Sequence, residues 1–214
     1  MIQPNRHPSE DLMLDYARGA TDAGRALVLA THLHACPACR AAVRLSEAIG
    51  GALIDELEPA ELAPDALVRA MARIDLPTPA MTPAPRAPHD WIKVPPEVLL
   101  AAKRNRRWAA PGVWVAPVTR DRRTGARSYL LGIGPGIAVP RHTHRGLELV
   151  CVLKGAYHDR GEVYGPGDFA ESDEDVEHRP QVTMDGECVC FAAADNALVA
   201  RDLIGRLMQP LVRI

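Results

Sequence analysis

The short stretch Thr31–Cys39 constrains the fold of this chain more than any other. It contains the pattern H-x3-C-x2-C, formed by His32, Cys36 and Cys39, between two segments with helical periodicity. Because His32 and Cys36 are four residues apart, a helix ending near residue 35 projects both side chains to one side. Pro37 is tolerated at the first position of a second helix, which places Cys39 in the first turn of that helix. The pattern therefore offers three zinc ligands without a distorted backbone.

A fourth ligand completes a closed tetrahedral zinc site, and His7 in the short segment before Ser9 is the preferred candidate. His34 is the rival, but it lies two residues from Cys36 and points away from the shared face. The predicted helix start lowers the pKa of nearby thiols, which favours the thiolate that binds metal and also the thiolate that oxidises. The alternatives to a structural zinc site are a thioredoxin-like redox pair and two unrelated thiols.

The length of the chain allows one large domain or two small ones, and the organisation of the sequence favours two. The 214 residues contain no run of about eighteen apolar residues, and Met1–Pro8 lack the apolar core of a signal peptide. The five cysteines are an odd number and too sparse for a secreted disulfide framework. We therefore expect a cytoplasmic protein with reduced thiols, bound metal and no membrane segment.

Residues 1–76 predict a small four-helix domain. Helices are expected from Ser9, from Thr21 or Asp22, from Pro37, and over Glu61–Ile74. The segment has a single aromatic ring, so its core is thin and its folding should depend on the metal. The last helix carries apolar side chains that either join this core or form a docking surface for a partner protein, namely Leu67, Met71 and Ile74.

Charge argues against direct contact with nucleic acid. Residues 1–76 hold 7 Lys and Arg against 11 Asp and Glu, and the remainder holds 18 against 16. Neither part has the strongly basic face of a nucleic-acid-binding domain. The basic cluster at residues 103–107 reads as a solvated segment. Any role in transcription would then pass through a basic protein partner.

The second half of the chain has the pattern of an antiparallel β-barrel or sandwich. Residues 77–95 form a proline-rich linker, residues 96–205 the β domain, and residues 206–214 a C-terminal tail. Short strands separated by Gly, Pro and Asp turns are expected at Val113–Val115, Tyr129–Leu131, Leu147–Leu153, Val163–Tyr164, Val182–Thr183 and Cys188–Ala192.

A second group of potential metal ligands lies in this β domain. On extended backbone, His142, His144 and Glu148 share parity and converge on one point, and His178 is a candidate fourth ligand. Three imidazoles and a carboxylate suit Zn, Mn, Fe or Ni without selecting one of them. The alternative is a set of hydrogen-bonded surface histidines on a barrel rim.

Cys188 and Cys190 lie two residues apart on a predicted strand, so their side chains share a face. They are either a redox-responsive pair or two small core residues, since disulfides between such neighbours are strained.

These motifs resemble known families. His142-x-His144-x3-Glu148-x6-Gly155 looks like the first cupin motif, and Gly167 with His178 looks like the second. The front pattern of His7 with His32-x3-Cys36-x2-Cys39 is similar to the zinc-binding anti-sigma domain. Together, in this order, they resemble the ChrR-type anti-sigma factors over nearly the whole chain.

The resemblance implies a regulator and no catalytic residues. It implies a one-to-one complex in which the N-terminal helices sequester an extracytoplasmic-function sigma factor, with zinc at the front site and zinc or another divalent transition metal in the cupin domain. It also implies that the cupin domain is needed for release in response to singlet oxygen. Two alternatives are a metal-dependent cupin enzyme, such as a dioxygenase or isomerase, and a thiol switch in which Cys36 and Cys39 lose zinc on oxidation.

Overall fold

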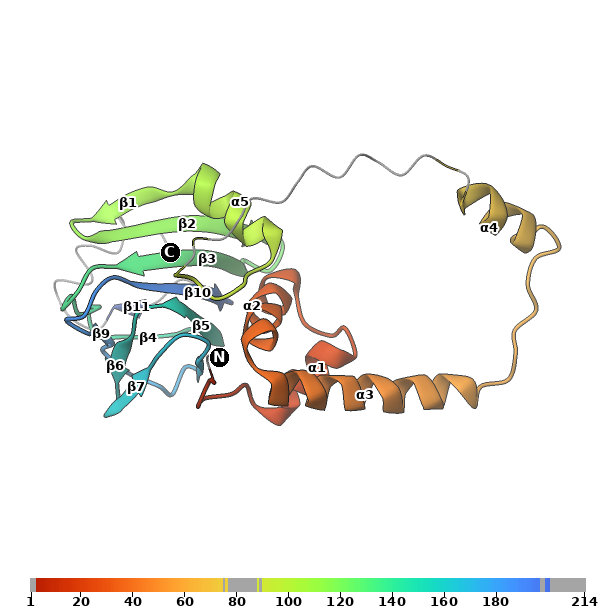
Figure 1. Cartoon of the computed structure of the whole chain (residues 1–214), viewed down its shortest axis with the longest axis horizontal. Coiled ribbons are helices and arrows are strands. Elements are labelled where there is room, and N and C mark those ends of the chain that lie inside the picture. The colour runs from red at the N-terminus through yellow and green to blue at the C-terminus, as the bar shows by residue number, and fades with distance from the viewer. Residues whose placement is uncertain (1–2, 75, 77–87, 89, 197–198, 201–214) are drawn as a thin grey trace.

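The structure, a computed structural model, describes residues 3–74, 76, 88, 90–196 and 199–200, and it contains a helical N-terminal region followed by an antiparallel β domain (Figure 1). This confirms the predicted combination of a helical front part and a cupin-type barrel. The helices are α1 (Glu10–Ala17), α2 (Ala23–Ala35), α3 (Pro37–Asp55), α4 (Ala66–Ile74) and α5 (Pro96–Asn105).

The helix starts follow the expected capping chemistry. The hydroxyl of Ser9 accepts a hydrogen bond from the N–H of Leu12, and the carboxylate of Asp22 accepts from the second and third residues of α2. Cys36 ends α2 and also caps α3, with Pro37 at the first helical position. The two helices are bent by 120° at this junction. Among the described residues, no single helix is both long and apolar enough to cross a membrane.

Helix α4 begins at Ala66, five residues after the predicted start at Glu61. Pro64 explains the difference, because a proline restricts the residue before it to extended backbone and supplies no N–H. The predicted linker lies outside the described residues from 77 to 87, and the predicted tail, residues 206–214, lies wholly outside them.

The β domain consists of three antiparallel sheets. The largest has the strand order β1-β2-β3-β10-β5-β8, and two smaller sheets have the orders β7-β6-β9 and β11-β4. The strands are β1 (Arg107–Ala110), β2 (Val113–Arg120), β3 (Arg127–Ile133), β4 (His142–Thr143), β5 (Glu148–Lys154), β6 (Tyr157–Asp159), β7 (Glu162–Tyr164), β8 (Phe169–Ser172), β9 (Gln181–Val182), β10 (Cys188–Ala194) and β11 (Val199–Ala200).

All six predicted strands are present, and five further strands have two to four residues each. Such short segments carry no clear alternation and are hard to detect from sequence. The basic cluster at residues 103–107 is exposed, as predicted for a solvated segment, and it lies at the end of α5 and the start of β1.

Strand β5 shows how the barrel divides its two faces. Leu149, Cys151 and Leu153 are fully buried on the face that meets the helices. Val150 and Val152 point to the barrel interior, as the alternation predicts. The large sheet is therefore covered on its outer face and surrounds its own interior on the other.

The helical region shares its main core with the barrel. Val28 and Leu29 of α2 and Leu12 of α1 are buried in one cluster with Leu149 and Phe191 of the sheet. Figure 1 shows α2 lying beside the β domain, where it contacts β2, β3, β5 and β10 of the large sheet. The sequence predicts a thin bundle supported by metal, and the structure adds burial against the sheet as a second source of stability.

The far end of α3 and all of α4 extend away from the barrel (Figure 1). The apolar stripe of α3 is exposed at Leu45, Ile49 and Leu53, and no residue of α4 is buried. Within the described residues, the four predicted helices therefore do not close into one bundle.

Candidate functional site

The first candidate metal site gathers His7, His32, Cys36 and Cys39. One ligand atom from each of these residues lies within 4.8 Å of all the others. The Nδ1 atom of His7 is 3.4 Å from Cys36 Sγ and 3.3 Å from Cys39 Sγ. His34 is exposed, and its Nδ1 lies 2.7 Å from the carbonyl oxygen of Ala30. The structure thus brings His7, and not His34, to the two thiols.

His32 provides the test of whether this group fits a metal. Its ring is fully buried, and Nδ1 lies 2.7 Å from the carbonyl oxygen of Gly167, so Nδ1–H donates and Nε2 carries the lone pair. Nε2 is buried and has no hydrogen-bond partner among the described residues. A buried lone pair without a partner is costly, and a metal ion bound here would remove that cost. Burial also lowers the pKa of His32, which keeps the imidazole neutral and able to bind metal.

The thiols differ from the sequence-based expectation. Burial raises the pKa of Cys39 to about 12, with the neighbouring Cys36 as a further cause, whereas the helix start was expected to lower it. Burial of the metal-free thiol is therefore the main cause of the raised pKa of Cys39. A cation that binds here must displace a proton, so its affinity should rise with pH. Two sulfurs and two nitrogens are a ligand set typical of tetrahedral zinc.

The second candidate metal site gathers His142, His144, Glu148 and His178, again with ligand atoms within 4.8 Å of one another. His142 and His178 face each other through paired backbone hydrogen bonds of 3.1 Å. The Nε2 atom of His178 lies 2.9 Å from that of His142 and 3.1 Å from that of His144. Nε2 of His144 is 3.4 Å from a carboxylate oxygen of Glu148. All four predicted residues therefore converge on one point inside the barrel mouth.

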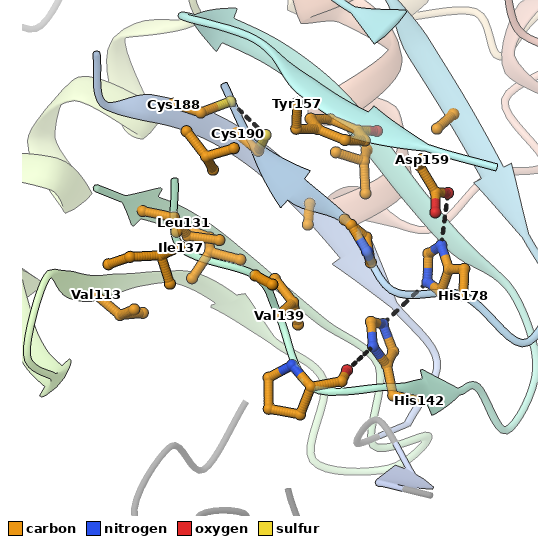
Figure 2. A pocket seen from close by; sticks show the side chains of 18 of the residues that line it. Val113, Leu131, Ile137, Val139, His142, Tyr157, Asp159, His178, Cys188 and Cys190 are labelled. Carbon is orange, nitrogen blue, oxygen red and sulfur yellow. Dashed lines mark hydrogen bonds and ion pairs between the residues drawn. The ribbon is translucent and has the colours of Figure 1, made fainter. Parts of the chain in front are cut away.

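Outer residues orient these ligands, and the sequence did not reveal them. Asp159 Oδ2 accepts a hydrogen bond from Nδ1 of His178 at 2.8 Å (Figure 2). The carbonyl oxygen of Pro140 lies 2.9 Å from Nδ1 of His142. The hydroxyl of Tyr129 donates to Glu148 at 3.0 Å. Both oriented imidazoles thus present Nε2 to the centre. Strand alternation could have indicated Tyr129, whereas Asp159 lies on a three-residue strand without a clear pattern.

The electrostatic environment of the second group favours the binding of a cation. Burial, and then repulsion by His142 and His178, lowers the pKa of His144 to about 4. At neutral pH this imidazole is uncharged and offers a lone pair. Burial raises the pKa of Glu148, and the hydrogen bond from Tyr129 partly offsets that effect. Nitrogen and oxygen lone pairs in van der Waals contact repel one another until a cation lies between them.

An apolar cavity of about 170 Å³ adjoins the second group (Figure 2). Its walls include Leu131, Ile137 and Val139, and His142 and His178 lie at one end. Cys188 and Cys190 line the cavity, with their sulfurs 3.7 Å apart. The interaction with Cys188, and then burial, raises the pKa of Cys190, which keeps that thiol protonated.

Comparison with known proteins agrees with both halves of this architecture. Residues 98–197 match the family described as the ChrR Cupin-like domain. The chain is 36% identical to the anti-sigma-E factor ChrR of Cereibacter sphaeroides, over 97% of this chain and 98% of the relative. It is also similar to ChrR in the crystal structure of Rhodobacter sphaeroides SigE in complex with the anti-sigma ChrR, with 34% identity and a TM-score of 0.75, covering 91% of this chain and 100% of that chain. An RmlC-like cupin protein of Ralstonia eutropha matches 44% of this chain and 63% of its own length at 22% identity and a TM-score of 0.41.

Proposed function

Since the chain belongs to the ChrR family of anti-sigma factors, we propose that it binds one extracytoplasmic-function sigma factor and sequesters it from polymerase and promoter. The crystallised relative is itself bound to a sigma factor, and this chain resembles that relative along most of its length. The proposed complex is stoichiometric and acts in the cytoplasm. Inhibition arises from occlusion of the sigma factor, without any chemical step.

The observation that carries this proposal is the uncovered apolar surface of α3 and α4. Leu67, Met71 and Ile74 are 72%, 54% and 73% exposed, and all three lie on α4. Contiguous apolar side chains of this kind are typical of a protein-binding surface. The acidic excess of residues 1–76 complements the basic surfaces by which a sigma factor binds polymerase and DNA.

The test of this proposal is a titration of the cognate sigma factor in an in vitro transcription assay. We expect one equivalent of the protein to abolish sigma-dependent transcripts. The substitutions Leu67→Asp, Met71→Asp and Ile74→Asp together should weaken binding more than about tenfold and leave folding intact, because the side chains are exposed. Met184→Asp is a matched control, since Met184 is 80% exposed on the barrel. A sigma factor that stays fully active with excess protein would refute the proposal.

We also propose that His7, His32, Cys36 and Cys39 bind zinc, which would hold the helices in the binding-competent arrangement. The second group would bind zinc or another divalent transition metal. Elemental analysis of the whole protein and of the variants Cys39→Ser and His178→Ala tests both assignments. Each variant should lose about one metal equivalent. Retention of all metal by either variant would contradict the assignment of that group.

The cupin domain is proposed to sense or transmit an oxidative signal, such as singlet oxygen, that releases the sigma factor. Cys188 and Cys190 are candidates for the oxidised groups because their sulfurs lie close together in the barrel cavity. The protonated state of Cys190 would slow attack by its sulfur. Replacement of both residues with serine tests their part, and an undiminished release would confine thiol chemistry to other positions.

A second candidate function, metal-dependent catalysis in the barrel, is favoured by the apolar cavity beside His142 and His178. A metal held there would polarise a bound substrate. One variant distinguishes the two functions. His178→Ala, which disrupts the second group, should abolish any reaction catalysed in the barrel, whereas binding of the sigma factor by the helices should persist.

A further inference from the structure

The turn between β7 and β8, residues 165–168, touches the first metal site at two places. The carbonyl oxygen of Gly167 accepts the hydrogen bond from Nδ1 of His32 at 2.7 Å. The carboxylate oxygen Oδ1 of Asp168 accepts from the backbone N–H of Asn5 at 2.7 Å and of Arg6 at 3.1 Å. Asn5 and Arg6 directly precede His7 in the chain. A single turn of the barrel thus contacts both histidine ligands or their immediate backbone.

This turn is itself fixed to the barrel. The second oxygen of Asp168 accepts from the N–H of Gly165 at 2.8 Å, and Asp168 is only 5% exposed. The backbone of Val152 on β5 accepts from Gly167 at 2.8 Å and donates to Asp168 at 3.0 Å. Gly167 has a φ angle of 90°, a backbone conformation that residues other than glycine rarely adopt. Strand β5 begins at Glu148, a member of the second metal group.

The segment that carries His7 has no helix or strand of its own. Residues 3–9 precede α1, and their backbone is tied to the barrel by Asp168 and by the hydrogen bond from Phe169 N–H to the carbonyl of Arg6 at 3.1 Å. A ligand on an extended segment must lose conformational freedom when it binds metal, unless other contacts have already ordered the segment. Asp168 supplies such contacts.

We propose that the turn at residues 165–168 positions the two histidine ligands of the front site, so that the barrel controls how tightly that site retains its metal. Asp168 orders the His7 segment, and the Gly167 carbonyl fixes the tautomer and direction of His32. A displacement of β5 or of this turn would therefore reach the front ligands through hydrogen bonds alone. This inference rests on the proposed metal site.

The test is the rate at which the full-length protein transfers zinc to a chromophoric chelator. Outer residues of this kind typically change metal affinity by about 10- to 100-fold, so Asp168→Ala should accelerate zinc transfer at least about tenfold. Asp195→Ala is the matched control. Asp195 also joins the barrel to α2, through Arg25, and it accepts from the N–H of Leu147 at 2.9 Å. In the part of the chain that the structure describes, it forms no hydrogen bond with a ligand of the front site. Zinc transfer from that variant should remain near the parent rate.

A His7→Ala background separates positioning from general damage. If Asp168 acts on the His7 segment, most of the acceleration caused by Asp168→Ala should disappear once His7 is absent. If the substitution merely unfolds the barrel, it should accelerate transfer equally in both backgrounds, which would overturn the inference.

Failure of the site and failure of the turn give different results. If the parent protein retains no zinc on His7, His32 and the two thiols, both the proposed zinc site and the proposed role of the turn are refuted. If the parent protein retains zinc and Asp168→Ala releases it at the parent rate, only the proposed role of the turn is refuted.

Discussion

Replacement of Leu29 by alanine tests whether the helices and the barrel share one core. Leu29 is 1% exposed on α2, in a cluster that also contains Trp114, Leu149 and Phe191 of the sheet. Loss of a buried leucine side chain costs about 2–5 kcal/mol, and a rigid sheet behind Leu29 limits how far the cavity can relax. With a urea dependence of about 1–3 kcal/mol per molar, the midpoint should fall by about 1 M or more.

Two probes make this measurement decisive. Far-ultraviolet circular dichroism follows the helices, and tryptophan fluorescence follows the barrel side, because all three tryptophans lie between residues 91 and 114. Both midpoints should fall together in Leu29→Ala. Leu53→Ala is the control, since Leu53 is 60% exposed on α3 and the change in helix propensity is the same. A shift in the circular dichroism midpoint alone would show that the two regions unfold separately and would refute the shared core.

Three further predictions follow from the described contacts. Gly132→Ala should lower stability by about 1–3 kcal/mol in urea unfolding, because the new Cβ would lie 2.1 Å from the Trp114 ring, whereas Gly51→Ala on α3 meets nothing and should be neutral or stabilising. In the metal-free protein the pKa of His144 is lowered to about 4, so between this pH and about 6.5 the unfolded chain binds a proton that the folded chain does not. The free energy of unfolding should therefore be highest above a pH of about 6.5 and should fall as the pH drops towards 4. His144→Gln should flatten that part of a series of unfolding measurements at different pH values. Cys36→Ser should reduce both the metal content and the affinity for the sigma factor in a calorimetric titration, and unchanged affinity with reduced metal would contradict a structural role for zinc.

The sequence was informative wherever spacing along one element decides the geometry. The offset between His32 and Cys36 and the cap at Ser9 depend on local helix geometry, and the structure has both as expected. The alternation of β5 was predictable for the same reason. His142 and His144 also lie close together, although β4 ends at Thr143 and strand parity does not reach His144.

Contacts between distant segments were not predictable in this way. Val28 and Leu29 have the pattern of any buried helix face, and nothing local specifies that a β-sheet covers them. The hydrogen bond from His32 to Gly167 uses a backbone carbonyl, which every residue type carries, so no pattern of side chains in the sequence predicts it. The raised pKa of Cys39 comes mainly from burial by the assembled fold, which the local sequence does not specify.

The sharp bend at Cys36 has a mechanical consequence. Helix α3 has 19 residues, so it extends about 28 Å from the junction where two of the four front ligands lie. A rotation of only about 10° at that junction would carry the tip of this lever arm about 5 Å, roughly the pitch of one helical turn. If a metal ion binds there, a small rearrangement around it would move the exposed apolar side chains of α3, such as Leu53, by a distance that packed side chains in an interface do not tolerate.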